Sequence, residues 1–342
     1  MSVKLPALEH DVERYYMDCF EYQFWYMVRE LGLNSYLPVL NAKSFYSLDN
    51  MDDVFNYEMN SNVVQVSQFY LDNIKCLKSN LETYFNVKFK NFSRNEYPDF
   101  CTFVKDAISK NRVVFSIYDN YFNTTDNEKF YLQQHAYHGT VILGYDDEKK
   151  IYFTNRDDIN CSDVENMVQH SMSKFKNIDL NLCIESWDEC SLSKESLQQK
   201  LSDDLKVTIK DWEEEIKLLR VLDKEFLNLE NDDETIIRKS LFLRSLFVGA
   251  STGLHGNFIY KLRLLEELYD KNLDEFFNKF LANRNVMGKI SNVIGKASFL
   301  LKVDHDDGMQ TLKRAKENFN KYLIDESSVL LEEFKELIKN EF

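Results

Sequence analysis

The sequence has 342 residues, 44% of them hydrophobic and 29% charged, an ordinary composition for a globular protein large enough for two domains. The formal net charge of −15 argues against a nucleic-acid-binding protein, because such proteins need a basic surface to displace phosphate counterions. No stretch approaches the roughly 18 uncharged apolar residues of a membrane span, and the N-terminus lacks the apolar core of a signal peptide. We therefore expect a cytoplasmic protein that binds neither nucleic acid nor membrane.

The first predicted element is a helix in the segment MDCFEYQFWYMVRELG. Apolar residues recur at three- and four-residue steps from Phe24 to Leu31, on one helix face, and Gly32 ends the helix. Cys19 then falls in the first turn, with Asp18 as the N-cap. Backbone N–H groups that point outward at a helix start favour a thiolate, so Cys19 is the candidate nucleophile. The alternative is a small buried hydrophobic residue.

The other cysteines have no comparable setting. None belongs to a C-x-x-C pair, which in a long chain without an export signal indicates reduced thiols and neither a disulfide framework nor a zinc site. They are Cys76, Cys101, Cys161, Cys183 and Cys190.

The segment from residue 100 to 190 contains β-type runs rich in Val, Ile, Phe and Tyr, namely RVVFSIYDNYF, GTVILGY, KIYFTN and NLCIESW. From about residue 200 onward, apolar residues recur at three- and four-residue steps, which predicts one amphipathic helix after another. We therefore predict an α+β protein with a mixed domain over 1–195 and an all-helical domain over 196–342. The helix of Cys19 should pack on an antiparallel sheet that includes 112–119, 139–145 and 150–155.

The second and third of these runs predict a hairpin around the charged turn 146–150. Pairing of its strands places His138 opposite a residue near 155–157, and Asn155 and Asp157 share a face because they are two positions apart. One register brings both within about 5–8 Å of His138, the reach that a carboxamide or carboxylate needs to orient an imidazole. His138 is the candidate base and Asn155 the candidate orienting residue, with Asp157 as its competitor.

A cysteine at a helix start, followed far downstream by a histidine on one strand and Asn or Asp on the next, is the order found in papain-like enzymes. Over about residues 15–160 the chain resembles the papain-like domain of bacteriocin-processing peptidases and, more closely, the butirosin-biosynthesis acyltransferase family. The amide-forming synthase of closthioamide assembly is another similar enzyme. Three blocks carry the resemblance, DCFEYQFWYMVRELGLNSYL, VVFSIYDNYFN and HAYHGTVILGYDD…IYFTN, while the helical half is similar only in general character.

The resemblance implies a papain-like first domain and an amide-forming acyltransferase of antibiotic or other natural-product biosynthesis. Cys19 would accept an acyl group from an acyl carrier protein and pass it to a small cationic amine or diamine. The carrier's phosphopantetheine arm would be the only cofactor. Asp119 and Tyr121 match the end of a family strand and are expected, with His135, to bind substrate. The related peptidases have an oxyanion-binding glutamine before the cysteine; residues 1–18 contain none, so Gln23 or the backbone N–H of Cys19 would serve.

Two other function classes remain open. A cysteine peptidase or thioesterase would use the same triad with water as the acceptor, and a helical interaction protein could carry an inactive papain-like domain. A metal site at His135 and His138 is disfavoured, because on a strand side chains three positions apart point to opposite faces. We therefore expect no metal.

Two features of the helical half also need an interpretation. The segment DHDDG at 304–308 is expected to be a turn between helices, since its glycine does not fit a calcium-binding loop. A basic stretch within this acidic protein could dock an acidic carrier protein or form an ordinary solvated face. It comprises Arg238, Lys239, Arg244, Lys261 and Arg263.

Overall fold

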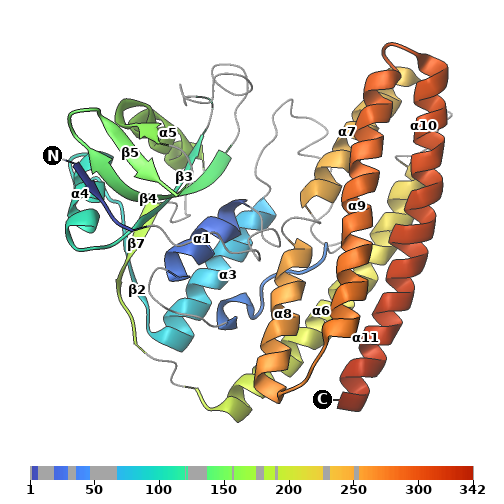
Figure 1. Ribbon diagram of the computed structural model, residues 1–342, viewed down its shortest axis with the longest axis horizontal. Coiled ribbons are helices and arrows are strands. Elements are labelled where there is room, and N and C mark those ends of the chain that lie inside the picture. The colour runs from blue at the N-terminus through green and yellow to red at the C-terminus, as the bar shows by residue number, and fades with distance from the viewer. Residues whose placement is uncertain are drawn as a thin grey trace. The chain divides into compact units, whose positions relative to one another are not determined.

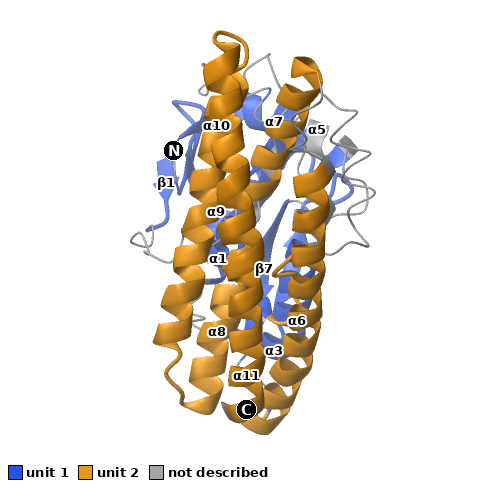
Figure 2. Ribbon diagram, turned by 90° about the vertical axis from the view of Figure 1, so that its right-hand side faces the viewer, with its two compact units in different colours: residues 1–39, 60–192 blue, residues 40–59, 193–342 orange. Residues whose placement is uncertain are grey.

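The computed structural model describes residues 2–6, 19–29, 36–46, 68–119, 121, 137–155, 158–174, 181–188, 192–225, 232–249 and 254–341. The chain divides into two compact units, shown in different colours in Figure 2. Unit 1 comprises Met1–Val39 and Asn60–Leu192, and unit 2 comprises Leu40–Met59 and Ser193–Phe342. The segment Leu40–Met59 therefore belongs to the same unit as the C-terminal half of the chain.

Unit 1 is an α+β unit built around an antiparallel sheet (Figure 1). Its strand order is β2-β7-β3-β4-β5-β6, and β1 pairs with the last residues of β4, Gly144 to Asp146. The predicted strands at 112–119, 139–145 and 150–155 are confirmed as β3, β4 and β5. The strands are β1 (Ser2–Lys4), β2 (Lys88–Asn91), β3 (Val114–Asp119), β4 (Tyr137–Asp146), β5 (Ile151–Thr154), β6 (Ile159–Asn160) and β7 (Asn181–Ser186).

Helices cover both faces of this sheet (Figure 1). On one face, Phe24 of α1 (Cys19–Arg29) packs edge-on against Phe115 of β3, with ring centroids 5.5 Å apart. Lys78 of α3 (Gln68–Phe85) lies 5.5 Å from the ring centre of Phe89 on β2. Since Phe89 and Phe115 both contact Phe24, α1 and α3 share this side, which we call the Phe115 face.

The opposite side, which we call the Tyr118 face, carries a hydrophobic core with α4 (Phe100–Ser109) and α5 (Cys161–Lys174). Phe103, Val168, Tyr118 and Ile142 belong to this one cluster of buried side chains. The start of α4 is fixed by Asp99, whose carboxylate accepts a hydrogen bond from the N–H of Thr102 at 2.7 Å. Apolar residues at helical spacing then turn one stripe of α4 toward the sheet.

Unit 2 is helical over its described C-terminal part, as predicted. Asp304 caps α10 by accepting from the N–H of Asp307 at 3.2 Å, so DHDDG forms the N-cap and first turn of α10, and the expectation of a turn between helices is wrong for this segment. The turn lies just before it, at 301–303. The helices are α6 (Lys194–Glu225), α7 (Asp233–Gly249), α8 (His255–Tyr269), α9 (Asp274–Leu300), α10 (His305–Asn318), the π-helical segment η6 (Phe319–Glu326) and α11 (Ser327–Glu341). In the described part of the chain, no helix has both the length and the apolar character needed to cross a bilayer.

The core of unit 2 includes a stack of aromatic rings to which the N-terminal segment 40–46 contributes. Phe45 stacks on Trp212 of α6 with centroids 4.7 Å apart, and Phe258 of α8 lies 5.3 Å from the same indole. The indole N–H of Trp212 donates to the hydroxyl of Ser327 at 2.8 Å, which satisfies its buried donor. The burial of Phe45 explains why segment 40–46 belongs to this unit.

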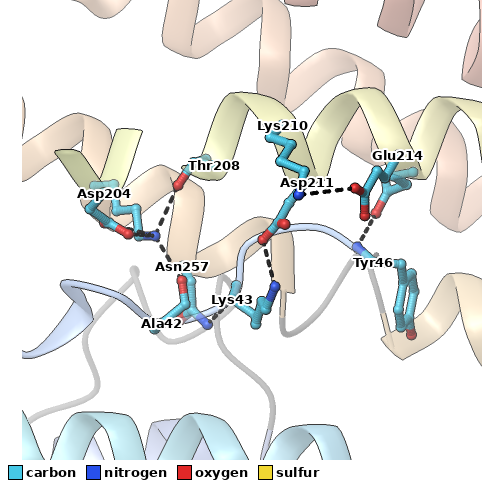
Figure 3. A network of polar contacts seen from close by, with 11 residues as sticks. Ala42, Lys43, Tyr46, Asp204, Thr208, Lys210, Asp211, Glu214 and Asn257 are labelled. Atoms are coloured by element: carbon cyan, nitrogen blue, oxygen red, sulfur yellow. Dashed lines mark hydrogen bonds and ion pairs between the residues drawn. The ribbon is translucent and has the colours of Figure 1, made fainter. Parts of the chain in front are cut away.

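Buried polar groups fasten the same segment (Figure 3). The ammonium of Lys261, a side chain only 1% exposed, donates to the carbonyl of Ala42 at 2.7 Å, to Asp204 at 3.0 Å and to Thr208 at 3.1 Å. A charge at this depth is tolerated only when it is paired and hydrogen-bonded. Lys261 is therefore part of the interior of unit 2 and not of a basic surface.

A second group of contacts continues this network along α6. Lys43 forms an ion pair with Asp211 at 2.9 Å, and the N–H of Tyr46 donates to Glu215 at 2.9 Å. The second carboxylate oxygen of Glu215 lies 2.8 Å from Nε2 of the buried His255. Asn257 donates to the carbonyl of Lys43 at 2.9 Å. Segment 40–46 is thus held against α6 and α8 by main-chain and side-chain contacts together.

Candidate functional site

The candidate nucleophile belongs to α1 (Cys19–Arg29), and the residues just before it, 7–18, lie outside the described residues. Helix α1 packs against β4 and β3. The first N–H groups of a helix have no partner within the helix and carry a partial positive charge, which favours an anion there. Asp18, the expected N-cap, lies outside the described residues. Stabilisation of a Cys19 thiolate by a helix start therefore stays a prediction from the sequence.

Strand register assigns His138 to a face of the sheet. His138, the second residue of β4, is paired with Tyr118 of β3, and their rings meet edge to face with centroids 6.0 Å apart. Directly paired residues share a face, so the imidazole lies on the Tyr118 face. Phe115 and its partner Val141 lie on the other face, on which α1 packs. The structure does not bring the side chain of His138 onto the face that α1 covers.

Asn155 follows β5 and is held against β4. Its N–H donates to the carbonyl of Val141 at 3.1 Å, and its Oδ1 accepts from the N–H of Val141 at 3.4 Å. Val141 is three residues along β4 from His138, about 10 Å at strand spacing. Asn155 is therefore engaged with the backbone of β4 and is not paired with His138. Its competitor Asp157, and His135, lie outside the described residues.

Asp119, in contrast, belongs to the α1 side of the sheet. It is the last residue of β3, is fully buried, and lies four positions after Phe115, so strand alternation puts it on the Phe115 face. Its Oδ1 accepts a hydrogen bond from the N–H of Tyr121 at 3.1 Å, which turns the chain as the strand ends. The Tyr121 side chain is half-buried. Asp119 is the predicted acidic site residue that the structure places on the same face as α1.

Gln23 carries an unsatisfied amide on the same helix as Cys19. Its side chain is fully buried, and in the described structure neither Oε1 nor Nε2 has a hydrogen-bond partner. Such a group costs about 1–3 kcal/mol of folding free energy, so a buried amide without a partner calls for a functional explanation. Gln23 follows Cys19 by four residues, one helical turn, and the two therefore share a helix face.

Two of the other described thiols, those of Cys161 and Cys183, have raised pKa values and are therefore poorer nucleophiles. Burial raises the pKa of Cys183 to about 11. Burial, and then the neighbouring Cys101, raise the pKa of Cys161 to about 11 as well. Thiols with such pKa values are almost fully protonated at neutral pH and react slowly with electrophiles. Cys190 lies outside the described residues.

Comparison of the chain with protein-family models, with curated proteins and with solved structures gives no match. Among the residues that the structure describes, no group of three or more His, Cys, Asp or Glu side chains is arranged to hold a metal ion. The candidate site is therefore defined by the start of α1, the buried amide of Gln23 and the buried carboxylate of Asp119.

Proposed function

We propose that the chain is a cysteine-dependent, amide-forming acyltransferase whose unit 1 is papain-like. It takes an acyl group from the thioester of a carrier protein and passes it to a small cationic amine in antibiotic or related natural-product biosynthesis. The observation that supports this most is that α1, which contains Cys19, packs on the face of the sheet that carries the buried Asp119, and the unsatisfied amide of Gln23 lies on the same helix.

The proposed reaction has two steps. The Cys19 thiolate attacks the thioester carbonyl, and collapse of the tetrahedral intermediate releases the carrier's thiol and leaves the acyl group on Cys19. The amine then attacks the new thioester, loses a proton to the base, and releases the amide and the Cys19 thiol. The backbone N–H of Cys19 and the amide of Gln23 donate to the oxyanion in both steps. Asp119 holds the ammonium group of the acceptor, for which a buried carboxylate is suited.

The base of this reaction is His138 or His135. His138 is the histidine that the resemblance implies, but its ring lies on the Tyr118 face, opposite the face that α1 covers. His135, three positions before His138 in the sequence, lies outside the described residues. We keep His138 as the base in the proposal, and the experiment below compares the two histidines.

The test is incubation of the purified protein with a simple acyl thioester, with and without a diamine, followed by mass spectrometry of the products. Formation of amide supports the proposal; release of free acid alone, whether or not diamine is present, makes the protein a thioesterase or peptidase. No turnover would favour the non-enzymatic interpretation. His138→Ala should slow acylation roughly a hundredfold, the usual contribution of a positioned base. If only His135→Ala has that effect, the base is His135 and the reaction stands.

Gln23→Met tests whether the unsatisfied amide takes part in the reaction. Because the substitution removes a buried polar group without a partner, the free energy of unfolding should rise by about 1 kcal/mol. Loss of an oxyanion donor should at the same time slow acylation about a hundredfold. Urea unfolding and the thioester assay measure the two effects.

The control is Gln198→Met on α6, which removes a donor that is satisfied by the carbonyl of Leu268 at 2.9 Å. This variant should lower stability slightly and leave acylation unchanged. A more stable Gln23→Met protein with unchanged acylation would remove Gln23 from the proposed mechanism.

A further inference from the structure

Two helices of unit 2 have no acidic residue beyond their first turns, in a protein that is otherwise strongly acidic. The chain has a net charge of −15, yet residues 235–265 and 276–303 contain no Asp or Glu. These ranges cover most of α7 and α9, which pack against each other. Apart from Lys261 and Arg263 on α8 and Lys302 in the turn after α9, the cations of the two ranges lie on these neighbouring helices.

Five exposed cations of these helices and the turn after α9 have no carboxylate within ion-pair distance in the described structure. They are Arg238, Arg244, Lys289, Lys296 and Lys302. Elsewhere in unit 2 many lysines are paired: Lys210 with Glu214 at 3.7 Å, and Lys335 with Glu213 at 2.8 Å. Among the described residues, these five positive charges therefore have no carboxylate partner, whereas Lys279 of α9 pairs with Glu275 and Glu333.

Exposed apolar side chains lie among these cations. The side chain of Arg244 on α7 contacts α9 at Gly295. A β-carbon added at Gly295 would lie 3.0 Å from the Cδ and Nε atoms of Arg244. Phe299, one helical turn beyond Gly295, is 64% exposed, and Leu241, three residues before Arg244, is 42% exposed. Large apolar groups surrounded by charged residues are typical of interaction surfaces, and Phe and Arg are enriched at the centres of protein interfaces.

We infer that this surface, which we call the α7–α9 surface, binds an acidic protein partner that places an apolar residue against Phe299 and Leu241. The inference rests on the proposed function, in which that partner is the acyl carrier protein that donates the acyl group. A protein with a local acidic patch fits better than nucleic acid or an anionic bilayer. An extended polyanion would be repelled by a chain whose net charge is −15, whereas a partner with a small acidic patch needs only these exposed cations.

The surface is tested by comparing two acyl donors. One is an acidic acyl carrier protein loaded with a simple acyl group, and the other is the same acyl group on free pantetheine. In the triple variant Lys289→Glu, Lys296→Glu, Lys302→Glu, kcat/KM with the carrier-bound donor should fall about tenfold or more, because like charges now oppose each other. With acyl-pantetheine kcat/KM should be unchanged, since the site in unit 1 is untouched.

A matched control makes the same change of charge elsewhere in unit 2, as Lys206→Glu, Lys210→Glu, Lys339→Glu, and should leave both donors unaffected. The inference would be overturned, while the proposed function stands, if the wild-type protein had the same kcat/KM with both donors. It would also be overturned if the triple variant kept the wild-type kcat/KM with both donors. If neither donor acylates the wild-type protein, the proposed function fails. The inference would also be overturned, in favour of a polyanion, if the wild-type protein bound phosphatidylserine vesicles or single-stranded DNA and the triple variant did not.

Discussion

Cys19→Ala is expected to abolish both the acyl-enzyme and the amide product, with a loss on the order of a thousandfold or more, because the substitution removes the atom to which the acyl group is bonded. Transfer of an acyl group from one thioester to a thiolate is nearly balanced in free energy, so the acyl-enzyme should accumulate when no amine is present. Intact-mass measurement should then show one added acyl group on the wild-type protein, assigned to Cys19 by peptide digestion. Cys19→Ser should be almost as inactive, since a hydroxyl is far less acidic than a thiol.

The controls are Cys161→Ala and Cys183→Ala. Both thiols have pKa values raised to about 11, so neither competes for the acyl group at neutral pH, and both variants should acylate like the wild-type protein. The assignment would be wrong if the acyl group were found on Cys76, Cys101 or another cysteine, or if the Cys19→Ala protein still became acylated.

The strands could be predicted because the apolar residues that are buried in the sheet are also the residue types that indicate a strand in the sequence. The runs at β3, β4, β5 and β7 are rich in Val, Ile, Phe and Tyr, which suit a pleated and buried surface. Helix α4 precedes β3 and helix α5 lies between β6 and β7, and neither was predicted. The two helices have 10 and 14 residues, lengths at which an isolated helix is marginal, and packing against the Tyr118 face stabilises them.

The geometry of the candidate site was harder to predict, because it depends on register. Pairing of β4 and β5 starts at Asp146 with Ile151, after a four-residue turn. A register shift between Ile142 and Gly144 then moves the pairing by one residue, so that Thr154 pairs with Ile142 and Asn155 meets Val141. A bulge of this kind depends on the strand that packs beside it, which here is β1. Strand β1 passes so close to Gly144 that a β-carbon at Gly144 would clash with the carbonyl of Val3. The hairpin sequence alone does not contain that information.

The buried network of unit 2 did leave a signal in the sequence, which lies in the spacing of polar residues along α6. Asp204, Asp211 and Glu215 fall at the same helical spacing as Leu201 and Trp212, on the stripe that faces the interior. Acidic residues on an apolar stripe predict buried cationic or hydrogen-bonding partners. What the sequence does not reveal is that these partners include the main chain of segment 40–46.

Lys261→Ala is expected to lower the free energy of unfolding by about 3–5 kcal/mol, as for the removal of one partner of a buried ion pair. The substitution leaves the carboxylate of Asp204, 5% exposed, without its cation, and the carbonyl of Ala42 without its donor. Urea unfolding followed by circular dichroism measures the change.

The control for this variant is Lys210→Ala on α6, which removes an exposed lysine whose contact with Glu214 is 3.7 Å long. Exposed pairs of this kind contribute about 0–1 kcal/mol, so the control should unfold close to the wild-type midpoint. The double variant Lys261→Met, Asp204→Leu removes both charges and fills their volume, and it should recover much of the lost stability because no unpaired charge remains buried. A Lys261→Ala protein as stable as the Lys210→Ala protein would show that segment 40–46 is not held by this ammonium group. In that case the stacking of Phe45 on Trp212 would be the contact that fixes the segment to unit 2.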